Sequence, residues 1–221
     1  MIPELDTAHP DEDWLTQWKK YGVRSSKVVA DLDGWNEATV AREIAQTLPE
    51  GSTIFVSSSR PIRDIESFAT PRNGLETFAN RGLAGIDGNI SSALGIATAR
   101  KNSFALIGDL AFLHDLTGLI TREVINCRIL VINNDGGGIF STLPQNGVAG
   151  FERVFGTPHG LDPAAIAASM GIPAISISTH KELKDEISKP ISGISVVVIN
   201  VPSRESNADN LKKIYQLIES I

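Results

Sequence analysis

The sequence contains a single cysteine, Cys127, among 221 residues, and its formal net charge is −6. One cysteine cannot form a disulfide within the chain, which favours a reducing compartment. No apolar run approaches the roughly 18–20 residues that span a bilayer, and residues 1–6 lack the basic start and apolar stretch of a signal peptide. The acidic excess argues against a general nucleic-acid binder. We therefore expect a cytoplasmic protein with no integral membrane segment and no nucleic-acid partner.

The remaining composition is that of an ordinary globular protein, with 42% hydrophobic and 21% charged residues. These values argue against disorder, collagen-like repeats and a coiled coil. Nineteen glycines and eleven prolines without a short period indicate many tight turns. The length allows one large domain or two small ones, with a core of substantial size in either case.

Residues 1–35 differ from the rest, because they contain all three tryptophans and few strand-like segments. Trp14, Leu15 and Trp18 lie at helical spacing, which predicts a short amphipathic helix. Two interpretations are open at this point. The helix packs on its own domain, or it is the tail of a preceding domain.

From Asn36 onward, strand-like and helical patterns alternate. We expect strands at 53–56, 76–79, 103–108, 128–132, 174–177 and 194–201. We expect helices at 40–48, 86–99, 116–125 and 163–171, and a last helix through 211–218. Strands that are apolar throughout, with helices between them, predict a parallel sheet covered on both faces. The expected fold class is α/β, a three-layer αβα arrangement with a mostly parallel sheet of about six strands.

A long segment without strands, 136–161, follows the fourth strand. Loops of such length in compact domains are typically lids or binding loops. His159 lies in this segment, and we expect it to pack within the loop rather than act as an acid or base. Cys127 opens a buried strand and is expected in the core. His114-Asp115 resembles a metal-dependent phosphohydrolase dipeptide, but no second cluster accompanies it.

Polar residues follow two successive predicted strands. Gly108-Asp109 ends one strand, Asn133-Asn134 ends the next, and Asn134 follows Asp109 by 25 residues, enough for one helix and a return strand. Carboxyl ends of parallel strands meet at one edge of a sheet, where ligands bind. A carboxylate and an amide oxygen suit Mg²⁺. The glycines at 136–138 let the backbone approach a ligand closely, and a helix starting after His114-Asp115 would direct N–H groups at phosphate.

Together, Gly-Asp and Asn-Asn at this spacing match the cofactor motif of thiamine-diphosphate enzymes, and the chain resembles their C-terminal, diphosphate-binding domain. More narrowly, it resembles the 2-succinyl-5-enolpyruvyl-6-hydroxy-3-cyclohexene-1-carboxylate synthases (MenD) of menaquinone biosynthesis. Five blocks in the same order carry this resemblance: SSSRPIRD, NRGLAGIDG, GDLAFLHDLTGL, NNDGGGIFSTLPQ and FERVFGTPHG. They cover most of residues 50–160.

The resemblance implies how the cofactor is held. Asp109 and Asn134 would ligate Mg²⁺ (or Mn²⁺) through their side chains, and Gly136 through its carbonyl. Leu110 and Ala111 would hold the diphosphate through backbone N–H groups. An apolar wedge under the cofactor would be Ile86. The implied cofactor-binding residues are Ile86, Gly108, Asp109, Leu110, Ala111, Asn134, Gly136 and Ile139.

The resemblance also implies a substrate site. Ser59, Arg63 and Arg81 match positions that bind the carboxylates of 2-oxoglutarate and of the succinyl intermediate, and guanidinium forks suit carboxylates geometrically. Ile139 and Phe140 would wall the substrate pocket. The implied reaction decarboxylates 2-oxoglutarate and adds the succinyl unit to isochorismate, which is a thiamine-diphosphate-dependent transferase activity.

The sequence departs from the family in two respects. Leu83-Ala84 stands where some members carry a small polar residue, which puts a hydrogen bond to the aminopyrimidine in question. Family chains are more than twice as long, and their N-terminal domain supplies the cofactor-activating glutamate to another subunit of a homodimer or homotetramer. No segment here matches that domain. The resemblance therefore implies a fragment, or one half of a split enzyme, without a catalytic residue of its own. In it, 1–35 is the tail of a preceding domain or a linker, and 36–221 is the diphosphate- and Mg²⁺-binding domain.

Two alternatives stay open beside this interpretation. The first is another enzyme of the same cofactor class, such as a pyruvate-type decarboxylase or an acetohydroxyacid synthase. Arg63 and Arg81 discriminate against it, because monocarboxylate substrates do not need them. The second is a non-catalytic module that binds a nucleotide, a phosphate or only a partner domain.

Overall fold

The computed structural model describes residues 12–83, 85–121 and 123–220. It divides into two units: Asp33–Leu211, which contains the sheet, and Met1–Leu32 together with Lys212–Ile221. The segment 1–6, in which no signal peptide is predicted, and Ala84 of the Leu83-Ala84 departure lie outside the described residues.

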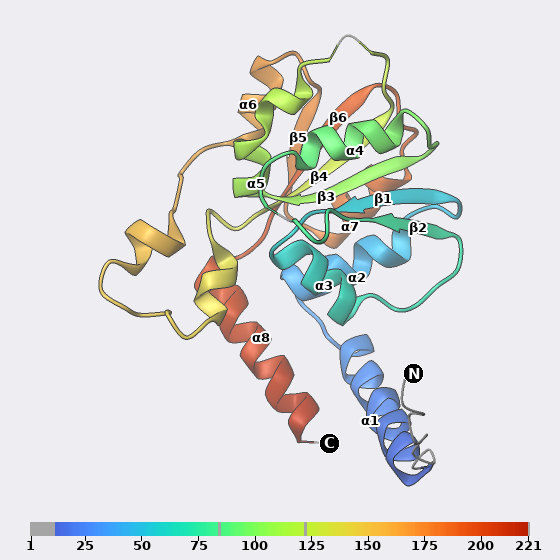
Figure 1. The fold of residues 1–221 in the computed structure, drawn as a ribbon, viewed down its shortest axis with the longest axis vertical. Coiled ribbons are helices and arrows are strands. Elements are labelled where there is room, and N and C mark those ends of the chain that lie inside the picture. Colours follow the sequence, from blue (N-terminus) through green and yellow to red (C-terminus); the bar gives the residue numbers. More distant parts are fainter. Residues whose placement is uncertain (1–11, 84, 122, 221) are drawn as a thin grey trace, which may run out of the picture. The chain divides into compact units, whose positions relative to one another are not determined.

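The larger unit is built on a six-stranded sheet in which all neighbouring strands run parallel (Figure 1). Its strands are β1 (Ser52–Val56), β2 (Leu75–Phe78), β3 (Ser103–Gly108), β4 (Cys127–Asn133), β5 (Ala174–Ile177) and β6 (Ile194–Asn200), arranged in the order β2-β1-β3-β4-β6-β5. The predicted α/β class and the predicted strands are confirmed, because each strand boundary lies within one residue of its expected place.

Helices cover both faces of the sheet. The helices on one face are α4 (Asn89–Ala97), α5 (Asp109–His114) and α6 (Pro163–Ser169). The helices on the other face are α2 (Glu37–Thr47), α3 (Arg60–Phe68) and α7 (His180–Ser188). In Figure 1, α4 lies above the central strands and α2 below them. This is the three-layer αβα arrangement that the alternation predicts.

Each face of the sheet has its own hydrophobic core. β3 contributes to both, because successive side chains of a strand point to opposite faces. Ala105 and Ile107 belong to the core under α4, whereas Phe104 and Leu106 belong to the core under α2. Cys127, at the start of β4, is buried in the first core as predicted, and burial raises the pKa of its thiol to about 12.

The structure corrects several helix predictions. The helix expected at 116–125 is replaced by α5, which begins directly after β3, and by a 3₁₀ turn at Leu116–Leu119. The helix therefore starts before His114-Asp115 rather than after it. α4 begins at Asn89 rather than at 86, because Gly88 adopts a left-handed conformation with φ 64°. α3 and α7 occupy segments in which no helix is predicted, since both are short and mostly polar.

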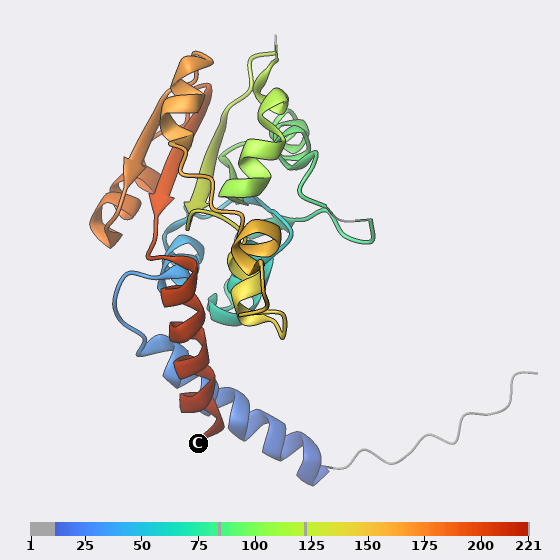
Figure 2. The ribbon, with the colours of Figure 1, turned by 90° about the vertical axis from the view of Figure 1, so that its left-hand side faces the viewer.

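The segment between β4 and α6 is long, as predicted, but it contains two single turns. These are a 3₁₀ turn at Gly138–Thr142 and a π-helical turn at Glu152–Gly156. Figure 2 shows them in yellow to gold, between the end of β4 and α6. The first turn carries part of the functional site described below.

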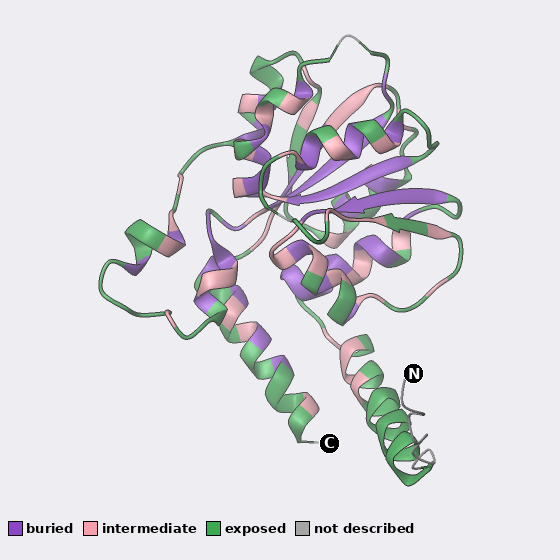
Figure 3. Ribbon diagram, in the orientation of Figure 1, coloured by how far each residue is buried: buried purple, intermediate pink, exposed green. Residues whose placement is uncertain are grey.

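The smaller unit contains α1 (Glu12–Ala30), which extends the helix predicted around Trp14. None of its residues is buried (Figure 3). The last helix, α8 (Arg204–Glu219), begins in the larger unit and ends in the smaller one. Within the described residues, no helix combines the length and apolar character required to cross a membrane. The assignment of 1–35 to a preceding domain stays a prediction.

Asp115 stabilises the start of α4, and its removal is expected to destabilise the fold. The carboxylate Oδ2 accepts hydrogen bonds from the backbone N–H groups of Ile90 (2.7 Å) and Ser91 (3.1 Å), whereas the N-cap residue Gly88 has no side chain to do so. We expect Asp115→Ala to lower the free energy of unfolding by about 1–2 kcal/mol. Urea denaturation measures this change. The control is Asp185→Ala on the exposed face of α7, for which a change below about 0.5 kcal/mol is expected; equal losses in the two variants would contradict the capping role.

Candidate functional site

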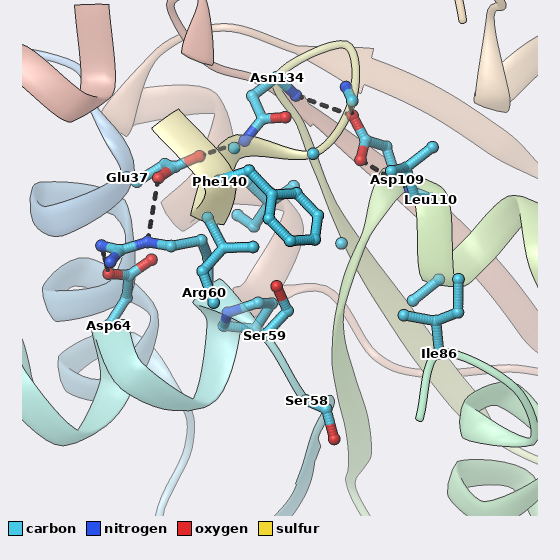
Figure 4. A pocket seen from close by; sticks show the side chains of 18 residues that line it. Glu37, Ser58, Ser59, Arg60, Asp64, Ile86, Asp109, Leu110, Asn134 and Phe140 are labelled. Carbon is cyan, nitrogen blue, oxygen red and sulfur yellow. Dashed lines mark hydrogen bonds and ion pairs between the residues drawn. The ribbon is translucent and has the colours of Figure 1, made fainter. Parts of the chain in front are cut away.

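A cavity of about 230 Å³ lies at the carboxyl ends of β1, β3 and β4. This is the edge at which open parallel sheets bind ligands. Figure 4 shows the residues that line it. They are Glu37, Ser58, Ser59, Arg60, Pro61, Asp64, Ile86, Gly108, Asp109, Leu110, Ala111, Ile132, Asn134, Gly136, Gly137, Gly138, Ile139 and Phe140.

Asp109, the residue directly after β3, joins the ends of two neighbouring strands. Its carboxylate is 2% exposed, and Oδ2 accepts hydrogen bonds from the backbone N–H groups of Asn134 (3.1 Å) and Gly136 (3.0 Å). Oδ1 accepts from the N–H of Leu110 at 2.7 Å, and His159 Nε2 lies 3.4 Å from Oδ2. Burial raises the pKa of Asp109, while the N–H donors of Gly136 and Leu110 and the nearby His159 oppose that rise. The carboxylate is thus fixed in place by the backbone around it.

Asn134 follows β4 and is 8% exposed. Its Nδ2 donates to Glu37 Oε1 at 2.5 Å, and its Oδ1 is a buried oxygen without a hydrogen-bond partner among the described residues. Gly136 has φ 134°, and a Cβ there would overlap the carbonyl oxygen of Gly156. Only glycine fits this turn. A buried oxygen without a donor, beside a carboxylate, is the environment that a hard cation satisfies.

A cluster of charged groups, the buried Glu37 and Asp64 with the half-buried Arg60, lies on the other side of Asn134 (Figure 4). Arg60 Nε is 3.6 Å from Glu37 Oε2, and the same guanidinium forms an ion pair with Asp64. Burial raises the pKa of both carboxyl groups, that of Asp64 to about 8, and Arg60 opposes the rise in each. Two buried acids and one guanidinium are electrically neutral when the pair of acids keeps one proton.

The turn from β1 into α3 is strained at Ser59. This residue is the N-cap of α3 and has φ 76° and ψ −132°, a conformation that favours glycine. Its side chain does not cap the helix. Strained backbone of this kind costs about 1–3 kcal/mol and is typically found at functional sites. Ser59 lines the cavity.

Most of the residues proposed from the sequence line this one cavity. These are Ser59, Ile86, Gly108, Asp109, Leu110, Ala111, Asn134, Gly136, Ile139 and Phe140. The N–H of Leu110, expected to hold diphosphate, donates to Asp109 in this structure. Each residue's role in binding stays a prediction.

Two predicted residues do not line the cavity. Arg63 is exposed, and its guanidinium donates to the carbonyl of Ser59 at 2.7 Å, on the same helix turn. Arg81 is exposed in the segment between β2 and α4. Both lie in chain segments that flank the cavity, which also contribute Ser59 and Ile86 to its wall. Their role in binding substrate carboxylates stays a prediction.

Sequence analysis missed the Glu37–Arg60–Asp64 cluster. Glu37 is the first residue of α2, a position where an acid is ordinarily a solvated partner of the helix dipole. Arg60 and Asp64 belong to α3, a nine-residue segment whose apolar residues Ile62, Ile65 and Phe68 lie at helical spacing but were not read as a helix in the sequence. A second signal was that the block SSSRPIRD contains a second arginine and an aspartate after the strand.

Comparison with known proteins places the chain in a family. Residues 64–201 match the family described as thiamine pyrophosphate enzyme, C-terminal TPP binding domain. The chain belongs to this family, so the class of protein is a thiamine-diphosphate-binding domain. Among its relatives are 2-succinyl-5-enolpyruvyl-6-hydroxy-3-cyclohexene-1-carboxylate synthases, and the resemblance to their C-terminal domain is thereby confirmed.

The similarity to these synthases extends over most of the chain. The synthase of Bacillus cytotoxicus is 39% identical over 212 residues, which cover 92% of this chain and 36% of the relative. That of Thermobifida fusca is 41% identical over 189 residues, which cover 82% of this chain and 34% of the relative. This chain therefore spans about a third of the length of these curated relatives.

A solved structure has the same fold at low sequence identity. The thiamine diphosphate-dependent 4-hydroxybenzoylformate decarboxylase of Rhodococcus jostii superposes with a TM-score of 0.61 at 16% identity. The match covers 79% of this chain and 34% of that chain. This similarity supports the fold alone.

The cluster of charged groups predicts a pH dependence of stability. Burial raises the pKa of Asp64 from 3.8 to about 8, so the folded chain binds more protons than the unfolded chain between these values. The free energy of unfolding then falls as pH rises from about 4 to 8, by at most about 1.4 kcal/mol per pH unit. We expect Asp64→Asn to reduce this slope, as measured by urea denaturation between about pH 5 and 8, and to leave the part that comes from Glu37 and Asp109, whose pKa values are also raised by burial.

The matched control for this pH dependence is Asp185→Asn, which neutralises an exposed aspartate on α7. It should keep the slope of the unmodified chain. A slope as steep in Asp64→Asn as in the unmodified chain would show that Asp64 does not cause it.

Proposed function

We propose that this chain is the cofactor-binding part of a synthase that decarboxylates 2-oxoglutarate and transfers the succinyl unit to isochorismate in menaquinone biosynthesis. The observation that carries this proposal is the juxtaposition of Asp109 and Asn134 at adjacent strand ends, in a chain whose relatives are named for that synthase. The thiamine-diphosphate-binding family supports the cofactor. The relatives' name gives the product, and the substrates are those that the resemblance of this chain's blocks to that family implies.

The described residues fit a divalent cation, Mg²⁺ or Mn²⁺. No group of three His, Cys, Asp or Glu side chains suited to a metal occurs in the described part of the chain, so a cation here would use mixed oxygen ligands. We propose Asp109, the unpartnered Oδ1 of Asn134 and the carbonyl of Gly136 as those ligands. Mg²⁺ accepts few protein ligands and completes its shell with water and phosphate oxygens, which suits this small set.

The chain's own residues would position and shield the cofactor. Ala111, near the start of α5, lines the cavity, and Ile86 contributes an apolar surface to the same wall. Ile139 and Phe140 form the wall on the β4 side. When bound, thiamine diphosphate supplies the electron sink for decarboxylation. The protein's part is to hold the diphosphate through the cation and to exclude water from the apolar wall.

We further propose that a complete active site needs a second polypeptide segment. The relatives are about three times as long as this chain. The partner we propose is the N-terminal pyrimidine-binding domain of a second subunit, in a homodimer or homotetramer located in the cytoplasm. On this proposal the 221-residue chain alone folds but does not turn over 2-oxoglutarate.

Loss of the Asp109 carboxylate should abolish metal-dependent cofactor binding. In Asp109→Asn the cavity loses its anionic oxygen, so the cation is held less tightly and the diphosphate is left unneutralised. We expect Mg²⁺ with thiamine diphosphate to raise the melting temperature of the unmodified chain and of the control Asp185→Asn, but not that of Asp109→Asn. A stabilisation by Mg²⁺ with ATP instead would favour a nucleotide-binding module. Equal stabilisation of all three proteins would remove the metal assignment.

The two exposed arginines should act on substrate rather than on cofactor. We expect Arg63→Ala and Arg81→Ala to raise the KM for 2-oxoglutarate roughly ten- to a hundred-fold in an active assembly, because losing a charge-assisted contact costs about 1.5–3 kcal/mol. Cofactor affinity should stay unchanged. Arg100→Ala, which removes an exposed arginine paired with Glu76, is the control. Unaltered 2-oxoglutarate kinetics, or better turnover of pyruvate, would favour another enzyme of the cofactor class.

A further inference from the structure

The side-chain amide of Asn134 has two ends in different surroundings. Its nitrogen donates to Glu37 Oε1 at 2.5 Å, and Gly138 leaves room for it, since a Cβ there would overlap Nδ2. Its oxygen is buried and has no hydrogen-bond partner among the described residues. An asparagine can present either end to a ligand, and the neighbouring groups decide which.

Glu37 is held in place from two sides. It opens α2, whose N-cap Asn36 forms a reciprocal capping box with Thr39, and its own N–H donates to Asn207 Oδ1 at 3.0 Å. Its Oε2 lies 3.6 Å from Arg60 Nε, and Arg60 is in turn paired with Asp64. Figure 4 shows these side chains in sequence from Asp64 to Asn134. One carboxylate oxygen therefore faces the guanidinium while the other faces the amide.

We propose that Glu37 is a positioning residue, which fixes the Asn134 amide with its oxygen directed at the cation site. A carboxylate oxygen facing the amide can only accept, so it selects the NH₂ end and leaves Oδ1 for the metal. This inference rests on the proposed function, because it assumes a divalent cation beside Asp109. Partners that orient a metal ligand commonly change metal affinity by about 10- to 100-fold when they are removed.

Two substitutions of Glu37 separate orientation from charge. In Glu37→Gln, the single oxygen is drawn to Arg60, the NH₂ group faces Asn134, and the amide of Asn134 turns its oxygen away from the cation. In Glu37→Asp, the charge remains but the side chain is one methylene shorter and falls out of hydrogen-bond reach. Orientation by Glu37 requires both variants to bind the cation more weakly. A purely electrostatic effect would spare Glu37→Asp.

The first measurement needs no cofactor. In ¹⁵N-labelled protein, the signals of the Asn134 side-chain NH₂, identified by their loss in Asn134→Asp, should be shifted by the bond to Glu37. We expect them to move to solvent-like positions in Glu37→Gln and in Glu37→Asp. They should stay in place in Glu43→Gln, a control on the same helix whose partners are Lys184 and His180.

The second measurement is Mn²⁺ binding, followed by electron paramagnetic resonance in the presence of thiamine diphosphate. We expect affinity to fall about tenfold in Glu37→Gln and Glu37→Asp, and to be unchanged in Glu43→Gln. The exchange variant Glu37→Gln with Asn134→Asp should recover affinity, since the introduced carboxylate accepts from the introduced amide with one oxygen and keeps the other for the metal. This exchange also preserves the net charge, so it serves as the test if Glu37→Gln alone fails to fold.

Two results would overturn the positioning role while the proposed function stands. One is a Glu37→Asp variant that binds Mn²⁺ as tightly as the unmodified chain. The other is that the Asn134 amide signals do not shift in either Glu37 variant. The positioning role is also overturned if the exchange variant binds Mn²⁺ no more tightly than Glu37→Gln does. If Glu37→Gln does not fold, the comparison is with Asn134→Asp instead. A wild-type chain that binds no Mn²⁺ with thiamine diphosphate would overturn the proposed function and the positioning role together.

Discussion

The Asp109 carboxylate is the interaction on which the rest of the site depends. It is placed at the end of β3 and accepts backbone hydrogen bonds from its own helix and from the turn after β4. The start of α5 and the turn after β4, which are distant in sequence, are thereby held at a fixed distance from each other. The parallel sheet makes this possible, because β3 and β4 pair over their whole length and end side by side. The geometry of the site is consequently set by the two central strands that carry it.

The fold was largely accessible from the sequence, because central strands of a parallel sheet are continuous apolar runs. The adjacency of Asp109 and Asn134 was accessible for a related reason, since one right-handed crossover must return the chain beside its starting strand. Short helices such as α3 and α7 carry only two or three apolar residues at helical spacing, too few to stand out from a loop in the sequence. They are stabilised by packing on the sheet through a few residues, Ile62 and Ile65 or Leu183 and Ile187, rather than by a long apolar stripe.

Side-chain direction was the part of the site that the sequence could not supply. Glu37, Arg60 and Asn134 come from three separate elements, and only the packing of α2 and α3 on one face brings them together. The hydrogen-bond partner of the Leu110 N–H could not be predicted either, since it depends on the rotamer of Asp109. Arg63 illustrates the reverse case: its position next to the cavity is predictable, but its contact with the Ser59 carbonyl is not.

The backbone conformation of Ser59 affects both the stability of the fold and the composition of the cavity wall. A serine occupies a conformation there that glycine would adopt without strain. Glycine would thus relieve the strain, although the gain is partly offset because glycine gains freedom in the unfolded chain. It would also remove a hydroxyl-bearing side chain from the cavity wall. The strain at this turn is therefore a stability cost that the proposed role of Ser59 in binding substrate would offset.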